Sequence, residues 1–242
     1  MSSASAQFAS AIAISTALLG AGAIACLSLF DVPILQAQPA SRSLPSIRWL
    51  FSRGSHVFPS AAGVASTAFA FVAYHTAAPI AAAATAGRTV TTAASLVSFL
   101  GELAFSKAYT TPRLYALAAA LSISIYPFTT FIMIPLNFSL IKLNNIKGGF
   151  ASSDGATAAK LATKDDINKT SQRSAQNSVN GVGELDTLQD LSGPQERTWL
   201  DTSAEEDATV RERLERFKWL NMTRAVLLGS GGIVGLATAL AK

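Results

Sequence analysis

The sequence has little charge and few of the residues that hold metals. Only 14% of its 242 residues are charged, whereas about a quarter is usual in a soluble domain. One cysteine, Cys26, excludes an internal disulfide framework, and the scarcity of cysteine and histidine argues against a protein-only zinc or iron–sulfur site. The chain also lacks GxGxxG, GxxxxGK[ST] and GxSxG. It therefore carries none of these common nucleotide-binding and hydrolase signatures.

Long apolar runs take the place of the missing charge. Half of the residues are hydrophobic, and four runs of 22–23 residues would each cover roughly 33–35 Å as a helix, enough for a hydrocarbon core of about 30 Å. These runs are rich in small residues, which let membrane helices approach closely. The sequence therefore predicts an all-α fold, an integral membrane four-helix bundle. Its predicted spans are Phe8–Phe30, Val57–Ala78, Leu114–Leu136 and Trp219–Ala241.

Two apolar stretches allow a second interpretation. Phe8–Phe30 has the position of a cleaved signal peptide, but it has no preceding basic residue and is longer than the usual apolar core of such a peptide. We predict a spanning helix there. Thr89–Phe105 is interrupted by Glu102, so we expect an interfacial stretch at 89–105, with a fifth span as the alternative.

The chain divides by composition into three parts. Residues 1–144 hold the first three spans. Residues 145–210 carry 11 acidic and 6 basic residues but only two aromatics, which predicts a polar, mostly disordered loop. Ser203 and Glu206 form a capping-box pattern, so we expect a helix that begins there and runs through 203–242 into the fourth span.

Basic residues gather in two of the predicted loops. Arg42, Arg48 and Arg53 follow the first span, while Lys142, Lys147 and four bases within 211–218 flank the long loop. The positive-inside rule then places loops 1 and 3 in the cytosol and both termini in the lumen of an endomembrane. Because these bases flank apolar runs, the net charge of +4 does not indicate nucleic-acid binding. A glycan on the sequon at Asn168 would mean the inverted orientation.

Polar groups within the spans are the candidate site residues. Arg224 lies about six residues into the fourth span, with Asn221 one turn earlier on the same face. The ends of neighbouring spans meet this membrane face and bring further candidates to one pocket. Most of these residues also have a purely structural interpretation. Arg224 could snorkel to the lipid headgroups, the asparagines could cap helices, the tryptophans could anchor the helices at the membrane interface, and His56 could be a solvated loop residue. The further candidates are Asn137, His56, Trp49, Trp219 and Arg53.

Two segments resemble one known family. Two stretches are similar to the hallmarks of the small fungal anthrone oxygenases: the run 126–140, which reads Tyr-Pro-Phe-Thr-Thr-Phe-Ile-Met-Ile-Pro-Leu-Asn-Phe-Ser-Leu, and the run 217–228, which contains Trp219, Asn221 and Arg224. In this sequence Asn221 follows Trp219 by two positions and Arg224 follows Asn221 by three. Trp49 to Gly54, followed by Pro59, resembles the family's first loop more weakly.

The resemblance implies a four-span oxygenase that converts polyketide anthrones to quinones with dioxygen as co-substrate and with neither metal nor flavin. Its partners would be the bilayer, a flat aromatic substrate and other polyketide-pathway enzymes. Arg224 would hold an oxyanion, Asn221 and Asn137 would orient it, His56 would act as base, and Trp49, Trp219 and Arg53 would bind substrate. The alternative is a non-catalytic membrane scaffold that recruits a partner through its acidic loop; a transporter is a weaker option.

Overall fold

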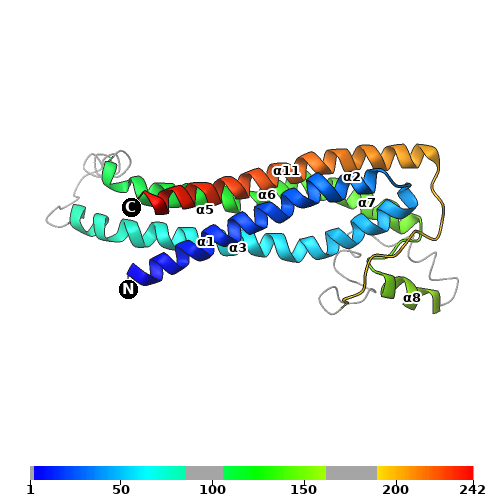
Figure 1. Cartoon of the computed structure of the whole chain (residues 1–242), viewed down its shortest axis with the longest axis horizontal. Coiled ribbons are helices and arrows are strands. Elements are labelled where there is room, and N and C mark those ends of the chain that lie inside the picture. The colour runs from blue at the N-terminus through cyan, green and yellow to red at the C-terminus, as the bar shows by residue number, and fades with distance from the viewer. Residues whose placement is uncertain (1–2, 86–105, 162–189, 242) are drawn as a thin grey trace, which may run out of the picture. The chain divides into compact units, whose positions relative to one another are not determined.

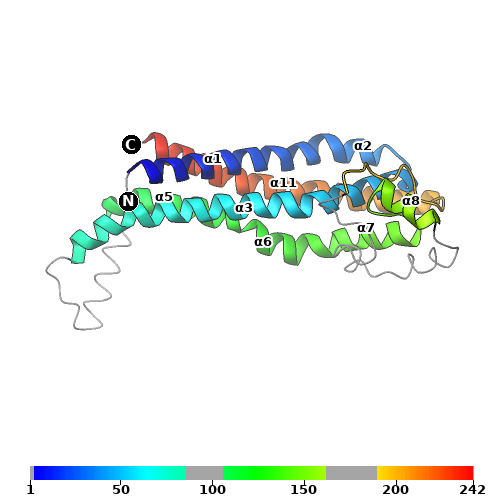
Figure 2. The same cartoon turned by 90° about the horizontal axis from the view of Figure 1, so that it is seen from below.

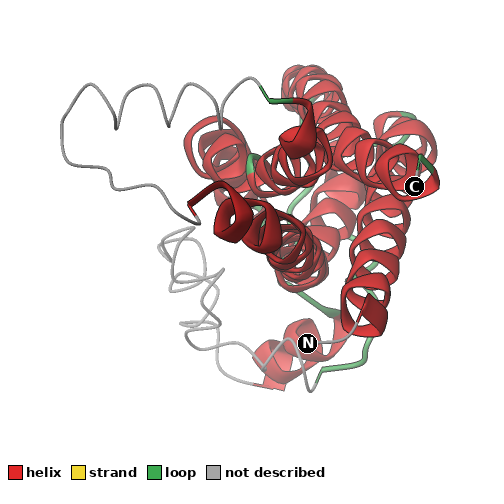
Figure 3. Ribbon diagram, turned by 90° about the vertical axis from the view of Figure 1, so that its left-hand side faces the viewer, coloured by secondary structure: helices red, strands yellow, loops and turns green. Residues whose placement is uncertain are grey.

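The computed structural model describes residues 3–85, 106–161 and 190–241, and the regular elements in these ranges are all helical (Figure 3). The all-α prediction is confirmed. In chain order the elements are α1 (Ser3–Cys26), the π-helical turn η1 (Leu27–Asp31), α2 (Val32–Gln36), α3 (Ala40–Thr85), η2 (Lys107–Tyr109), α5 (Thr110–Ile123), α6 (Ile125–Phe128), the π-helical turn η3 (Thr129–Met133), α7 (Ile134–Ile146), α8 (Ser153–Leu161) and α11 (Ala204–Leu240).

Four helical stretches of the described chain are long and apolar enough to cross a membrane, as predicted. They make the chain an integral, multi-pass membrane protein. At about 1.5 Å per residue, α3 and α11 are roughly 69 and 55 Å long, well beyond a hydrocarbon core of about 30 Å. Each therefore continues outside the bilayer. The predicted interfacial stretch at 89–105 lies outside the described residues.

The predicted first loop is wrong over most of its length. Helix α3 begins at Ala40, so Arg42, Arg48 and Arg53 are helical, and only residues 37–39 join α2 to α3. The reason lies in the apolar period: Ala40, Leu44 and Ile47 recur at helical spacing and are all buried. The first backbone N–H of α3 at Ala40 is capped by the Asp207 carboxylate, 2.8 Å away.

The described chain separates into two compact units, and α1, α3 and α11 contribute residues to both. The first unit comprises Met1–Gly22, Ser60–Ile125 and Ala225–Lys242. Its helices pack through small residues: a Cβ added at Gly235 would lie 2.3 Å from the Phe69 ring. Polar contacts here are few, such as Ser10 to Tyr115 at 3.3 Å between hydroxyl oxygens.

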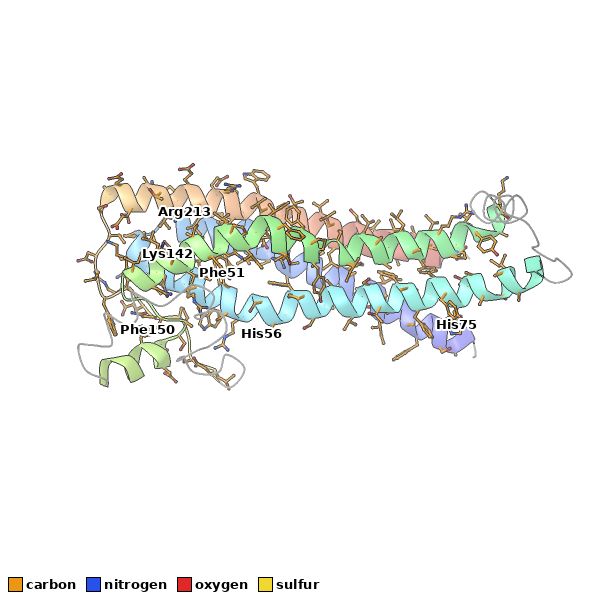
Figure 4. The ribbon with its side chains drawn as sticks, turned by 180° about the vertical axis from the view of Figure 1, so that it is seen from behind. Phe51, His56, His75, Lys142, Phe150 and Arg213 are labelled. Carbon is orange, nitrogen blue, oxygen red and sulfur yellow. The ribbon has the colours of Figure 1, made fainter. Side chains whose placement is uncertain are left out.

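The second unit comprises Ala23–Pro59 and Tyr126–Arg224. Within it, α2 and α7 lie on opposite sides, with the first parts of α3 and α11 between them (Figure 2). Phe51 of α3 packs edge-on against Phe217 of α11, with ring centroids 5.1 Å apart (Figure 4). Its hydrophobic core comes from all four of these helical segments and includes Leu27, Val32, Leu35, Leu44, Ile47, Met133, Leu136, Leu140, Val210, Leu214 and Phe217.

The described parts of the polar stretch 145–210 are ordered. Helix α8 lies beside the extended segment 190–203, here named the strap (Figure 1), and Ser153 N–H donates to the Gly193 carbonyl over 2.9 Å. The rings of Phe150 and Trp199 pack together in a tilted arrangement, with centroids 5.0 Å apart and an interplanar angle of 54°. At the end of the strap, Ser203 and Glu206 exchange the two hydrogen bonds of a capping box. Residues 162–189 lie outside the described residues.

Candidate functional site

Arg224 is buried in the second unit and retains only 7% of its exposure. Its Nη1 donates to Asn221 Oδ1 over 3.1 Å and lies 3.9 Å from Met133 Sδ. Its guanidinium carbon stands 5.7 Å from the centre of the Phe58 ring, within the range of a cation–π contact. Arg224 therefore points inward among apolar groups, which disfavours the snorkelling alternative.

Asn221 holds the guanidinium through a short relay. It is fully buried, and its Nδ2 donates to Ser28 Oγ over 3.0 Å and to the Ile24 carbonyl over 3.1 Å. Because Nδ2 meets two acceptors, Oδ1 is left to accept from Arg224, which fixes the amide orientation. Ser28 Oγ itself donates to the Ile24 carbonyl over 3.1 Å. The relay ties α11 to the first helical segment.

Two π-helical turns supply the neighbours of Arg224 and Asn221. Ser28 lies in η1 and Met133 ends η3. A proline follows each turn by two positions, Pro33 and Pro135. A proline within a helix removes one backbone donor and clashes with the carbonyl four residues earlier, and for both prolines that carbonyl lies inside the π turn. The prolines thus account for the local widening, and π turns are frequent at functional sites.

The positive charge of Arg224 is not matched by a carboxylate among the described residues, since none lies within ion-pair distance. A buried ion is costly unless it is paired. The walls around it, Met133 and Phe58, are apolar. A buried cation in such surroundings favours a partner that carries or develops a negative charge.

Asn137 lies one turn after Met133, on the face that Met133 presents to Arg224. Its Oδ1 is buried and has no hydrogen-bond partner among the described residues. The structure thus joins Arg224 and Asn221 directly, whereas Asn137 is linked to them only through its position one turn after Met133, which contacts Arg224.

His56 and Trp219 do not join this cluster. His56 is exposed on α3 (Figure 4); it precedes Phe58 by two positions, and residues so spaced face different sides of a helix. Trp219 is 62% exposed, and its indole Nε1 donates to Glu215 Oε1 over 2.8 Å. This is the geometry of an interface anchor.

Trp49 and Arg53 contact the strap. Trp49 Nε1 donates to the Ser192 carbonyl over 2.9 Å, and the Arg53 guanidinium donates to the Asp190 carbonyl and lies 5.5 Å from the Trp49 ring. Burial raises the pKa of the Asp190 carboxyl, but hydrogen bonds from Ser152 and Ser192 and the charge of Arg53 outweigh it, so the net pKa lies below its usual value. These contacts fasten the strap to α3.

Sequence reasoning missed three neighbours of the central pair: Ser28, Met133 and Phe58. The hydroxyl within the uncharged first span was a usable signal, because membrane serines seek hydrogen-bond partners on other helices. Across the described ranges, no group of three or more histidine, cysteine, aspartate or glutamate side chains is arranged to hold a metal ion.

Comparison with known proteins gives one match. A family model described as anthrone oxygenase matches residues 76–234, which include the 126–140 run and the Asn221–Arg224 pair and exclude Trp49, Arg53 and His56. No curated protein and no solved structure matches the chain.

Proposed function

Because the chain belongs to the anthrone oxygenase family, which supports a membrane oxygenase-like role, we propose that it oxidises a flat, anthrone-like polycyclic compound to a quinone with dioxygen. The observation that carries the proposal is the buried Arg224, held by Asn221 and lined by Met133 and Phe58 without a carboxylate partner among the described residues.

The proposed reaction needs little from the protein beyond charge and shape. Loss of a proton from the anthrone methylene gives an electron-rich enolate. The enolate carbon transfers electrons to dioxygen and forms a C–O bond, and the resulting hydroperoxide loses water as its C–H and O–O bonds break. The methylene carbon is thereby oxidised to a carbonyl. One oxygen atom enters the product and the other leaves as water, so no added reductant is required.

Arg224 has the chemistry to favour the ionised substrate. Its charge is fixed at neutral pH, and a donor aimed at a developing oxyanion acts most strongly where water is excluded. Asn221 acts as the positioning residue. Asn137, whose buried Oδ1 has no hydrogen-bond partner among the described residues, is proposed to orient the substrate through its amide. Because His56 is exposed, it stays in the proposal only as an acceptor of protons that solvent has already carried away from the site, a role that water can fill equally well.

The proposal extends to location and partners. An apolar substrate would partition into an endomembrane, and the basic first part of α3 and the bases that flank the long loop would face the cytosol. Enzymes that assemble polyketides would supply the anthrone. Dioxygen is the co-substrate, and the reaction as written uses neither metal nor flavin.

The test is turnover in microsomes. The full chain is expressed in microsomes lacking endogenous activity and supplied with emodin anthrone, while quinone formation and oxygen uptake are followed with and without a chelator. We expect one oxygen consumed per quinone, insensitivity to the chelator, and a loss of about 100-fold or more in Arg224→Leu. Membrane extraction and thermal unfolding of Arg224→Leu serve as the folding control.

The scaffold alternative predicts the reverse pattern. If Arg224→Leu oxidises the anthrone at the wild-type rate, the proposed function is wrong. If deletion of residues 162–189 abolishes function in the producing cell while turnover in microsomes persists, the acidic loop has a separate recruiting role.

A further inference from the structure

A second site lies on the outer side of α11, away from Asn221. A groove of about 430 Å³ runs between the first part of α11 and the segment formed by η3 and α7. The groove lies wholly within the second unit. The side chains that line the groove are basic at one end and apolar at the other.

The basic end is built from α11. Arg213 and Arg216 line it together with one acid, Glu212. Arg213 Nη1 donates to the Ser139 carbonyl over 3.2 Å, which holds this guanidinium against α7. No carboxylate of the described chain lies within ion-pair distance of either arginine. Lys142, one turn after Ser139, adds a third positive charge at this level (Figure 4).

The apolar end is built from the π turn and the start of α7. Ile132 and Pro135 line it, and both are exposed, Ile132 over 43%. Phe131 beside them is more exposed still. Exposed apolar side chains on a spanning helix face lipid chains. Trp219, one turn after Arg216, marks the level of the membrane interface.

The groove thus sets two guanidinium groups at the interface directly above an apolar wall. This order matches an anionic phospholipid, whose phosphate lies at the interface and whose acyl chains extend into the hydrocarbon. Basic pockets between helices on the cytoplasmic side are suited to such headgroups, and arginine forks match phosphate oxygens. We propose that this groove binds an anionic phospholipid, with its phosphate on Arg213 and Arg216 and one acyl chain along Ile132 and Pro135.

The charge balance of the groove gives variants with opposite expected effects. Removing both arginines should weaken retention of the lipid by about fivefold for each charge lost. Glu212→Gln removes the one acid that lines the groove and should strengthen retention. Arg211→Gln is the matched control: it also removes one positive charge from α11, but Arg211 Nε donates to the Gln36 carbonyl on the α2 side.

The experiment uses the full chain in nanodiscs of phosphatidylcholine with and without a minor fraction of phosphatidylinositol. Native mass spectrometry counts the phosphatidylinositol molecules retained by wild type, Glu212→Gln, Arg211→Gln and Arg213→Gln/Arg216→Gln. We expect selective retention by the wild type and the control, more by Glu212→Gln, and little by the double variant. Thermal unfolding in lipid-free detergent reports whether the double variant is folded; if it is not, Arg216→Gln alone takes its place.

Two outcomes would overturn the proposal. Equal retention by the double variant and wild type would mean that the arginines do not hold the lipid. Displacement of the lipid by millimolar inorganic phosphate or inositol phosphate as readily as by phosphatidylinositol would mean a site for soluble anions. Because every readout is binding, failure here is distinguishable from failure of the proposed oxidation.

Discussion

In the unit formed by Met1–Gly22, Ser60–Ile125 and Ala225–Lys242, glycines set how closely the helices approach. A Cβ added at Gly231 would lie 2.9 Å from the Ala118 carbonyl oxygen. In the unit formed by Ala23–Pro59 and Tyr126–Arg224, the buried groups include two arginines, Arg48 and Arg224, several asparagines and the serine of the relay. The interior of the first unit is filled mainly by closely packed apolar residues, whereas the interior of the second unit holds polar groups whose burial costs free energy. Buried polarity without full pairing marks the part of a membrane protein where chemistry belongs.

The largest effect on activity among these variants is expected at Asn221, in the second unit. Asn221→Ala removes the acceptor that holds Arg224, so the guanidinium loses its orientation while the charge stays. Hydrogen bonds to charged groups contribute about 1.5–3 kcal/mol, so we expect a 10- to 100-fold fall in kcat with quinone formation as the measurement. Ser28→Ala, one step further along the relay, should lower kcat several-fold. Equal, negligible effects of both variants would contradict the relay.

A variant in the first unit should show the opposite pattern, with a loss of stability and no loss of activity. Gly231→Val forces a branched side chain against Ala118 and Ser122 and should destabilise the fold by about 1–3 kcal/mol, measured by thermal unfolding in detergent. The turnover of the folded fraction should match wild type. Gly22→Val is the control, because nothing lies within 4 Å of its added Cβ. A selective loss of kcat in Gly231→Val would contradict the assignment of stability to the first unit and of activity to the second.

The strap sharpens the comparison through pH. The lowered pKa of Asp190 means that its carboxylate stabilises the fastened strap above the unfolded-state pKa, and that this contribution is lost as pH falls through the lower folded-state pKa. We expect the protection factor of the Ser192 amide, which is the exchange rate of an unstructured peptide divided by that of this amide at the same pH, to fall below about pH 4. Asp190→Asn should show the lower protection factor already at neutral pH and little further change in it on acidification. An unchanged wild-type profile would show that Asp190 does not fasten the strap.

The smallest effect is expected at His56. Because His56 is exposed and lies on another side of α3 from Phe58, His56→Gln should keep turnover within about twofold of wild type, within the usual range of a surface change. The pH profile of kcat should also stay unchanged. A large fall in kcat with loss of a titration near neutrality would instead make His56 the general base.

Short-range patterns in the sequence predicted much of this architecture. The four apolar runs gave the spans because a bilayer requires them, and the spacing of Asn221 and Arg224 put both on one helix face. The capping pattern at Ser203 and Glu206 likewise depends only on neighbouring residues. These features are encoded within one or two helical turns.

The features that could not be predicted from the sequence depend on contacts between residues that lie far apart in the chain. Ser28 and Met133 reach Arg224 and Asn221 only through the packing of separate helices. The positions of His56, Trp49 and Arg53 were misjudged because the arginines of α3 suggested a loop. The buried period of Ala40, Leu44 and Ile47 was the signal that a helix already runs there.

Because of the π-helical turns, the number of residues between the flanking helices matters as well as their identity. Such a turn contains one residue more than an α-helical turn between the same flanking segments. Deleting a single residue from Leu27–Asp31 would therefore remove the widened turn while keeping the flanking faces of α1 and α2 in phase. The span would persist, but the hydroxyl of Ser28 would lose its register with the amide that it steadies. Spacing, as well as residue identity, thus sets the aim of the buried guanidinium.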